Sequence, residues 1–313
     1  MLIILTVLLA LYISWSIGSN DETMGTLAGC GYISMGRAVL IGAIADALGA
    51  ILLGYRVEET IGRGLISVDL TYYDIFVIMV SMATWLIISS AMGIPISTTH
   101  SIVGAVTGLG VYKYGLQSLN LKSLVRIAAG WILSPLIGVI MAYFMEKFVS
   151  MYLKRRVRGL IDRLKVGRFS GLMLLVWTTY TSFFRGANDI ANATSFISLM
   201  FDPILARTIC GIGMAVGVLT LGRRVVRTVG EELVELDPVS ALAVQISVAS
   251  TLSIGTMLGL PLSGSQILVA AIIGIGLARG SWINIQELKH MILTWITTFP
   301  GAAILAIAFA YVI

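Results

Sequence analysis

Charged residues are scarce in this 313-residue chain. Asp, Glu, Lys and Arg make up 12% of it, whereas 58% is hydrophobic. Because soluble globular proteins contain about 25% charged residues, this shortage excludes a water-soluble globule. A hydrocarbon core of about 30 Å needs roughly 20 apolar residues per helical crossing, so a chain of this length can supply about eight to ten such segments. We therefore expect an all-α polytopic membrane protein.

Cysteine and histidine are also rare, with two of each. Cys30 and Cys210 lie in apolar stretches at positions that do not correspond in the two halves, so we expect buried thiols rather than a disulfide or a metal site. A membrane-embedded hydrolase could use His100 with a serine, but the sequence near His100 offers no partner acid, and His290 falls at a predicted helix end. Neither an enzyme nor a bound cofactor is expected.

The chain contains an internal duplication. Asn20-Asp21 recurs 168 positions later as Asn188-Asp189. The segment 93–100 (Gly-Ile-Pro-Ile-Ser-Thr-Thr-His) recurs 166 positions later as 259–266 (Gly-Leu-Pro-Leu-Ser-Gly-Ser-Gln), and the difference of two positions is an ordinary loop deletion. We infer one integral membrane domain of two repeats, residues 1–150 and 169–313, joined by a basic linker over residues 151–168.

Each repeat is expected to contain four membrane elements. If the hairpin among them enters and leaves on the same side, each repeat crosses the membrane three times, and the odd count inverts the second repeat. Inverted repeats with broken helices are typical of secondary transporters, whose sites form near the bilayer midplane. The elements are a helix broken at Asn-Asp (1–35 and 169–203), a second crossing (38–54 and 205–222), a re-entrant hairpin (72–112 and 238–279) and a last crossing (123–149 and 288–313).

Lys and Arg set the expected orientation. The 151–168 linker is the most basic segment of the chain, and basic loops are retained in the cytoplasm. With the linker inside, both termini lie outside, and fourteen Lys and Arg residues face the cytoplasm against six outside, with Arg185 left in the membrane. Cytoplasmic loops thereby explain the net charge of +5, and no nucleic-acid partner is expected.

Polar residues inside apolar segments form the first candidate site: Asn20, Asp21, Asn188, Asp189 and Asn192. Intramembrane carboxylates are costly and usually functional. Carboxylate and amide oxygens suit a small hard cation such as Na⁺ better than a transition metal. A glycine two positions before each pair, Gly18 and Gly186, is expected to open the helix and free carbonyl groups. The alternative is that these polar groups only hydrogen-bond to one another across a helix interface.

Hydroxyl-bearing residues follow a Gly-x-Pro break in each expected hairpin and form the second candidate site. Free backbone N–H groups at a new helix start, together with hydroxyl groups, make a cradle for an oxyanion such as phosphate. An ordinary helix start with its N-cap is the alternative. The residues are Ser97, Thr98 and Thr99 in the first hairpin and Ser263, Gly264 and Ser265 in the second, with His100 and Gln266 beside them.

These motifs resemble the inorganic phosphate transporter (PiT) family in its compact prokaryotic form. The resemblance rests on residues 185–193 (Arg-Gly-Ala-Asn-Asp-Ile-Ala-Asn-Ala), 95–100 and 224–230 (Arg-Val-Val-Arg-Thr-Val-Gly), and on the duplication. It implies a cation-coupled permease for phosphate, with sulfate in one branch of the family, built as inverted repeats. It further implies that Asn20, Asp21, Asn188, Asp189 and Asn192 serve the coupling ion and phosphate region, and that Ser97, Thr98, Thr99, Ser263 and Ser265 hold the oxyanion.

The chain departs from the family pattern near these motifs. After Asp21 it reads Glu-Thr-Met-Gly where the family continues Val-Ala-Asn-Ala, and Gly264 and Gln266 stand for Thr and His. Arg185 stands where His is common, and it could pair with an Asn-Asp acid or attract the oxyanion. Asp46 replaces a usual Glu and could complete a cation site, relay a proton or make a structural hydrogen bond.

The sequence thus predicts a secondary active transporter that takes up phosphate by symport with a cation through alternating access, with Na⁺ favoured over H⁺. A sulfate permease of the same family is the alternative, followed by an anion channel, which would also have paired re-entrant loops. The expected partners are the lipid bilayer, a small inorganic oxyanion and a monovalent cation. The sequence leaves open whether the chain is a monomer or a homodimer.

Overall fold

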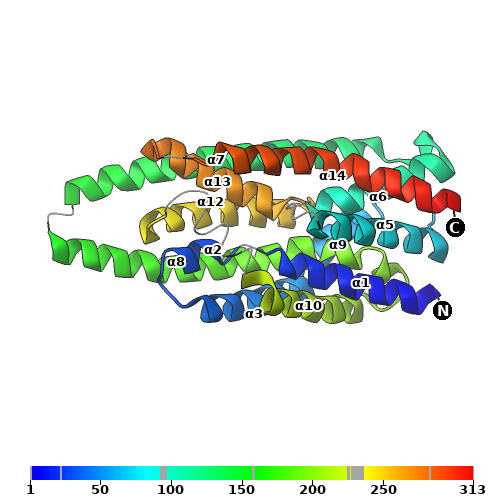
Figure 1. Ribbon diagram of the computed structural model, residues 1–313, viewed down its shortest axis with the longest axis horizontal. Coiled ribbons are helices and arrows are strands. Elements are labelled where there is room, and N and C mark those ends of the chain that lie inside the picture. Colours follow the sequence, from blue (N-terminus) through cyan, green and yellow to red (C-terminus); the bar gives the residue numbers. More distant parts are fainter. Residues whose placement is uncertain are drawn as a thin grey trace.

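Helices are the regular elements of the computed structural model, which describes residues 2–21, 23–91, 97–156, 159–223, 226, 236–281 and 283–312. The long helices lie side by side along the long axis of the molecule (Figure 1). The elements are α1 (Leu2–Ser19), α2 (Gly25–Gly29), α3 (Met35–Leu53), α4 (Tyr55–Gly62), α5 (Tyr72–Ala91), α6 (Thr98–Leu109), η1 (Gly110–Tyr114), η2 (Leu116–Ser118), α7 (Leu121–Arg156), α8 (Leu160–Asp189), α9 (Ala191–Thr194), η3 (Ile197–Leu199), α10 (Pro203–Thr220), α12 (Pro238–Met257), α13 (Gly264–Arg279) and α14 (Ile285–Val312).

Six of the described helices are long and apolar enough to cross a membrane: α1, α3, α7, α10, α12 and α14. In the apolar windows of α7 and α14 only 22% of the residues are buried within the protein, so most of their apolar surface faces outward, where lipid covers it. The 12-residue α6 spans about 18 Å, which is too short to cross. The chain is therefore a multi-pass membrane protein, as the composition predicted.

Two pairs of helices pack as hairpins, α5 with α6 and α12 with α13 (Figure 1). Ser97 caps α6, since its Oγ accepts a hydrogen bond from the His100 N–H at 3.4 Å. At the second tip Gly259 has a φ of 68°, and a Cβ there would lie 2.8 Å from the Arg56 carbonyl oxygen. Only glycine fits such a conformation easily. Gly93 and Pro95 of the first motif lie outside the described residues.

Corresponding helices of the two repeats make corresponding contacts. α1 packs on α10 as α8 packs on α3, with a glycine against backbone at each crossing. A Cβ on Gly18 would lie 1.9 Å from the Met214 carbonyl oxygen, and one on Gly186 would lie 2.1 Å from the Asp46 carbonyl oxygen. Gly18 and Gly186 are 168 positions apart, and so are their contact residues Asp46 and Met214. Small residues allow membrane helices to approach closely, so the duplication in the sequence is also a duplication of packing.

The last crossing of each repeat packs on the hairpin of the other repeat, α7 on α13 and α14 on α6. Glycines again mark the contacts, because a Cβ on Gly104 of α6 would lie 2.3 Å from the Phe299 carbonyl oxygen of α14. Both last crossings contain an interior proline, Pro135 in α7 and Pro300 in α14. α1 begins at the end of the molecule where the termini lie, whereas α8 begins at the opposite end, so the repeats are inverted (Figure 1).

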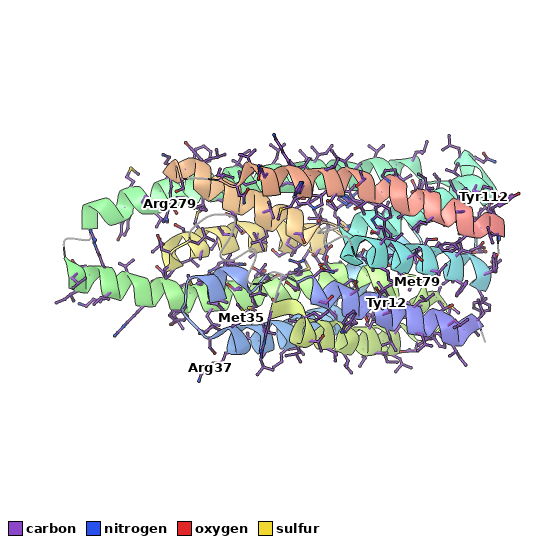
Figure 2. The ribbon with its side chains drawn as sticks, in the orientation of Figure 1. Tyr12, Met35, Arg37, Met79, Tyr112 and Arg279 are labelled. Atoms are coloured by element: carbon purple, nitrogen blue, oxygen red, sulfur yellow. The ribbon has the colours of Figure 1, made fainter. Side chains whose placement is uncertain are left out.

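The predicted second and last crossings agree with α3, α10, α7 and α14, whereas α12, expected as half of a re-entrant hairpin, is itself long and apolar enough to cross. Two local features were not predicted. The segment 151–168, expected as a linker, is largely helical, because α7 continues to Arg156 and α8 starts at Leu160. Arg37 and Arg279 lie toward this end of the molecule, and Tyr112 lies toward the end where the termini are (Figure 2). The short helix α4 lies between α3 and the first hairpin, in a region for which no element was expected.

Candidate functional site

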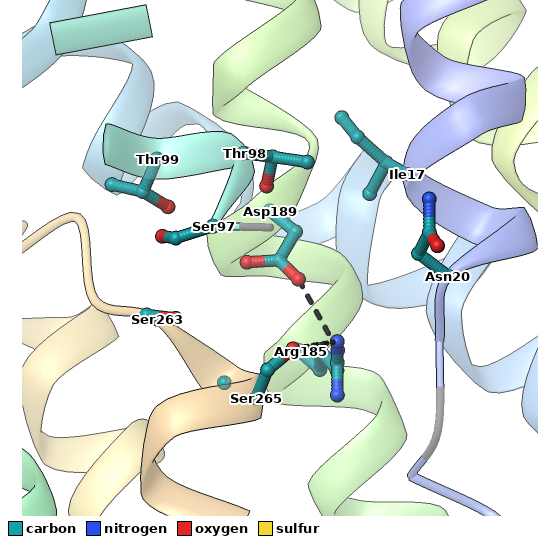
Figure 3. Close-up of a pocket in the computed structure, with 10 residues that line it drawn as sticks. Ile17, Asn20, Ser97, Thr98, Thr99, Arg185, Asp189, Ser263 and Ser265 are labelled. Atoms are coloured by element: carbon teal, nitrogen blue, oxygen red, sulfur yellow. Dashed lines mark hydrogen bonds and ion pairs between the residues drawn. The ribbon is translucent and has the colours of Figure 1, made fainter. Parts of the chain in front are cut away.

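The two sets of residues singled out in the sequence meet at the centre of the molecule (Figure 3). The end of α1, the end of α8 and the first turns of α6 and α13 surround one cavity. The cavity measures 10 Å³, about the space of a single water-sized sphere, so its walls are nearly in contact. It is lined by Ile17, Asn20, Ser97, Thr98, Thr99, Arg185, Asp189, Ser263, Gly264 and Ser265.

Arg185 joins both candidate sites. Its Nε donates to Asp189 Oδ2 at 3.2 Å, and its Nη1 lies 3.5 Å from Asp21 Oδ1. On the other side, its Nη2 donates to Ser265 Oγ at 3.1 Å. Only 4% of the residue is exposed, so these contacts form in a water-poor environment. The ion pair expected from the sequence therefore involves both Asn-Asp acids, and the same guanidinium also reaches the hydroxyl cradle.

Asn188 fixes the tip of the second hairpin. Its side-chain Nδ2 donates to Thr256 Oγ1 and to the Leu260 carbonyl oxygen, both at 2.9 Å. Its Oδ1 accepts from the Leu262 N–H at 3.0 Å. The side chain is fully buried. These bonds match the structural alternative for the polar residues, in which they hydrogen-bond across a helix interface.

Asn192 links α9 to the first hairpin. Its Nδ2 donates to Thr98 Oγ1 at 3.1 Å and to Thr99 Oγ1 at 3.3 Å. Thr99 Oγ1 in turn donates to the Leu262 carbonyl oxygen at 3.1 Å, so the two hairpin tips are in direct contact. Asn192 Oδ1 is buried and has no hydrogen-bond donor within the described part of the chain. A single polar network therefore connects both broken helices with both hairpins.

Asp46 is a fully buried acid behind the cavity. It interacts electrostatically with Asp21, Arg185 and Asp189. The carboxyl group of Asp46 meets that of Asp21, and apart from this contact neither of its oxygens has a hydrogen-bond donor among the residues described. Gly186 packs against its backbone, which places Asp46 next to the residue that follows Arg185. Carboxylate oxygens buried without donors are expensive, so this group is poised to take up a positive charge.

The carbonyl groups of Gly18 and Gly186 themselves are not free. The Gly18 carbonyl accepts from the Asp21 N–H, and the Gly186 carbonyl accepts from the Ile190 N–H, both at 3.1 Å. The interruption of the second repeat is only the turn at Ile190 between α8 and α9. The two glycines are needed instead for the close helix crossings, where any side chain would strike the Met214 or Asp46 backbone.

His100 and Gln266 lie beside the cavity without lining it. His100 Nδ1 is 3.1 Å from the Trp295 carbonyl oxygen, and its ring contacts the Trp131 ring at a centroid distance of 3.9 Å and a tilt of 49°. Trp131 Nε1 donates to the Pro261 carbonyl oxygen at 3.0 Å. His100 is therefore packed between the last crossings. Gln266 is buried, and its Oε1 has no donor among the described residues.

Sequence reasoning missed two polar residues that support the site. Thr23 donates its backbone N–H to Asp21 Oδ1 at 2.7 Å, and its hydroxyl accepts from Arg185 Nη1 at 3.3 Å. Gln245 on α12 donates to the Thr23 carbonyl oxygen at 3.1 Å and to Thr26 Oγ1 at 2.7 Å. A glutamine within an apolar helix was the available signal, but it belongs to no recurring motif.

Within the part of the chain that the structure describes, no three His, Cys, Asp or Glu residues are grouped closely enough to hold a metal ion. A site for Na⁺ at the Asn-Asp pairs would therefore need amide and carbonyl oxygens in addition to carboxylates, as hard cations accept. Cys30 and Cys210 are free thiols.

Comparison with known proteins bears on this arrangement. The sequence profile described as the phosphate transporter family matches residues 17–306. A protein of Pyrococcus horikoshii that carries the provisional name phosphate permease is 29% identical, over 97% of this chain and 96% of that protein. The chloroplastic inorganic phosphate transporter 2-1 of Arabidopsis thaliana is 23% identical, over 98% of this chain and 71% of that protein.

A solved structure of similar fold is described as that of a sodium-dependent phosphate transporter. It superimposes with a TM-score of 0.86 at 26% identity and covers 99% of this chain and 98% of that one. The profile match spans most of the sequence, and the resemblance drawn from the motifs is thereby confirmed. The chain belongs to the phosphate transporter family.

Proposed function

We propose that this protein takes up inorganic phosphate in symport with Na⁺ by alternating access. The observation that carries the proposal is the convergence of an oxyanion cradle and buried carboxylates around one central cavity. The family assignment and the names of the relatives support phosphate as the substrate, and the similarity to a solved sodium-dependent phosphate transporter supports Na⁺.

In this proposal the oxyanion binds between the first turns of α6 and α13. Helix starts present free N–H groups and about half a positive charge, and hydroxyl groups add donors. The donors are Ser97, Thr98, Thr99, Ser263 and Ser265 with the backbone at Gly264, all of which line the cavity. Because the cavity has room for about one water-sized sphere, it must widen before a tetrahedral oxyanion can enter. Separation of the two hairpin tips, which are joined by the Thr99–Leu262 hydrogen bond, would widen it.

The carboxylates Asp21, Asp46 and Asp189 are proposed to recruit the coupling cation, with Asn20, Asn188 and Asn192 as neighbouring polar groups. Cation binding would neutralise the acids and make it favourable for an anion to enter beside them. The position of Asp189 at the cavity also favours phosphate over sulfate. A protonated phosphate can donate a hydrogen bond to a carboxylate, whereas sulfate at neutral pH has no proton to donate.

Alternating access is supported by the inverted repeats and by their exchanged packing. α1 and α10, and likewise α3 and α8, are in backbone contact at glycines, so each pair is suited to move as a unit. Each hairpin is held by the last crossing of the other repeat. One group of helices could thus rock against the other around the central cavity. We place the termini outside and the 151–168 segment in the cytoplasm.

Proteoliposomes test the proposal directly. Purified protein should accumulate radioactive phosphate when an inward Na⁺ gradient is imposed, and accumulation should stop when choline replaces Na⁺. Sulfate uptake is measured in parallel. Arg207→Gln serves as a control variant, because Arg207 is a buried arginine that pairs with Glu58 away from the cavity. Uptake of sulfate but not phosphate would change the substrate. Conductance far above transporter turnover would indicate a channel.

A further inference from the structure

Arg185 places a fixed positive charge between the acids of the two Asn-Asp motifs. Its guanidinium lies 3.2 Å from Asp189 and 3.5 Å from Asp21, and the backbone of Asp46 packs against the neighbouring Gly186. The pair with Asp189 is visible at the cavity wall in Figure 3. Among the described residues of this centre, one guanidinium therefore pairs with the carboxylates of both Asn-Asp motifs. This is the position in which the proposed mechanism requires a cation.

The charge breaks an otherwise repeated pattern. Gly18, Asn20 and Asp21 correspond to Gly186, Asn188 and Asp189 at the offset of 168 positions, but Arg185 corresponds to Ile17. Both Ile17 and Arg185 line the cavity. One repeat thus supplies an apolar side chain and the other a cation at equivalent places. Because Ile17 occupies the equivalent position, the helix packing shared by the two repeats does not need a charge there. We therefore relate the charge of Arg185 to the ions that the site binds.

The guanidinium cannot leave its position as a transported ion does. The neighbouring Gly186 is locked against the Asp46 backbone, where a Cβ would lie only 2.1 Å from the carbonyl oxygen. Arginine also stays protonated under all physiological conditions. Its remaining donors are directed to protein groups, with Nη1 3.3 Å from Thr23 Oγ1 and Nη2 3.1 Å from Ser265 Oγ. The positive charge is therefore permanent and tethered.

We propose that Arg185 takes the place of one coupling cation, so that this chain binds one Na⁺ fewer for each phosphate than the same site would without the arginine. The inference rests on the proposed function, because it concerns the ions of that cycle. Buried carboxylates need compensating positive charge, and a charge supplied by the protein removes the need for one supplied by the solvent. Through Ser265 the same group stays in contact with the oxyanion cradle.

The number of bound cations tests the proposal. Equilibrium binding of ²²Na⁺ to purified protein in detergent, with phosphate present, is compared for wild type, Arg185→Gln and Arg185→Lys. We expect Arg185→Gln to bind one more Na⁺ per chain at saturation than wild type. Arg185→Lys retains the charge and should bind the wild-type number. Arg207→Gln, which removes another buried arginine outside the cavity, should also leave the number unchanged.

Three results would overturn the proposal. The first is that folded Arg185→Gln binds the same number of Na⁺ ions as wild type. The second is that this variant loses only phosphate affinity, which would make Arg185 an oxyanion ligand. The third is that no variant binds Na⁺. If Arg185→Gln is unstable, its melting temperature should rise with NaCl more steeply than that of wild type and not respond to choline chloride. An equal rise of the melting temperature with NaCl in wild type and variant would also overturn the proposal. The number of bound Na⁺ ions is measured at equilibrium and does not depend on transport. Failure of phosphate uptake would therefore contradict the proposed function without deciding this inference.

Discussion

Replacing Asn188 by alanine should loosen the second hairpin tip by a predictable amount. The change removes three buried hydrogen bonds, to Thr256, Leu260 and Leu262, each between 2.9 and 3.0 Å. Hydrogen bonds between membrane helices average about 0.6 kcal/mol, so three contribute about 1.8 kcal/mol, and the orphaned Leu262 N–H brings the cost to about 2 kcal/mol or more. A local free energy of about 2 kcal/mol corresponds to a roughly thirtyfold rise in the open population of the tip.

Hydrogen exchange followed by mass spectrometry measures this population. Peptides covering residues 258–263 should exchange roughly thirtyfold faster in Asn188→Ala than in wild type, because exchange requires the tip to open. Asn20→Ala is the matched control from the other repeat. Its described hydrogen bond, at 3.0 Å, stays within α1 on the Ser16 carbonyl oxygen, so its loss should not affect this tip. Unchanged exchange in Asn188→Ala, or an equal increase in Asn20→Ala, would refute the assigned role of Asn188.

Three further predictions concern transport and topology. Asp21→Asn and Asp189→Asn should each abolish Na⁺-driven phosphate uptake in proteoliposomes while folded protein remains, and wild-type uptake in either variant would remove that acid from the mechanism. Ser97→Ala and Ser263→Ala should each weaken phosphate binding by roughly ten- to a hundredfold, the effect of one charge-assisted hydrogen bond, while Na⁺ affinity changes less. Titration of the purified variants with phosphate and with Na⁺ measures both affinities. A change in Na⁺ affinity alone would contradict the assignment of these hydroxyl groups to the oxyanion cradle. Single cysteines at residues 159–168, in a background without native cysteines, should resist impermeant thiol reagents applied outside cells; labelling would reverse the proposed orientation.

The membrane class, the duplication and the family could be recognised from the sequence because each depends on local residue identity. Long apolar segments require lipid wherever they are placed, and a repeated motif is visible without its partners. Several helix boundaries followed for the same reason, since α3, α10 and α14 end near the predicted positions. The sequence also identified the two polar constellations, because Asn-Asp pairs and Ser-Thr clusters are unusual in apolar segments.

The partners of these polar residues were decided only by the tertiary structure. Asn188 and Leu262 are 74 positions apart, and Arg185 and Ser265 are 80 apart, so their contacts depend on how α8 meets the tip of the second hairpin. The packing role of the glycines was missed for this reason. Gly186 is a helix breaker by propensity, but packing against Asp46 makes it a contact residue in an unbroken turn.

The same limit applies to the architecture as a whole. The sequence predicted two inverted repeats, but it contains no local sign that α7 packs on the hairpin of the second repeat and α14 on that of the first. Such pairing is set by which glycine-lined faces fit together at backbone distance, as between Gly104 and Phe299. Amino-acid types therefore determined which groups this protein must hold in the membrane. Long-range packing decided that these groups share one cavity and that the guanidinium of Arg185 lies between its acids.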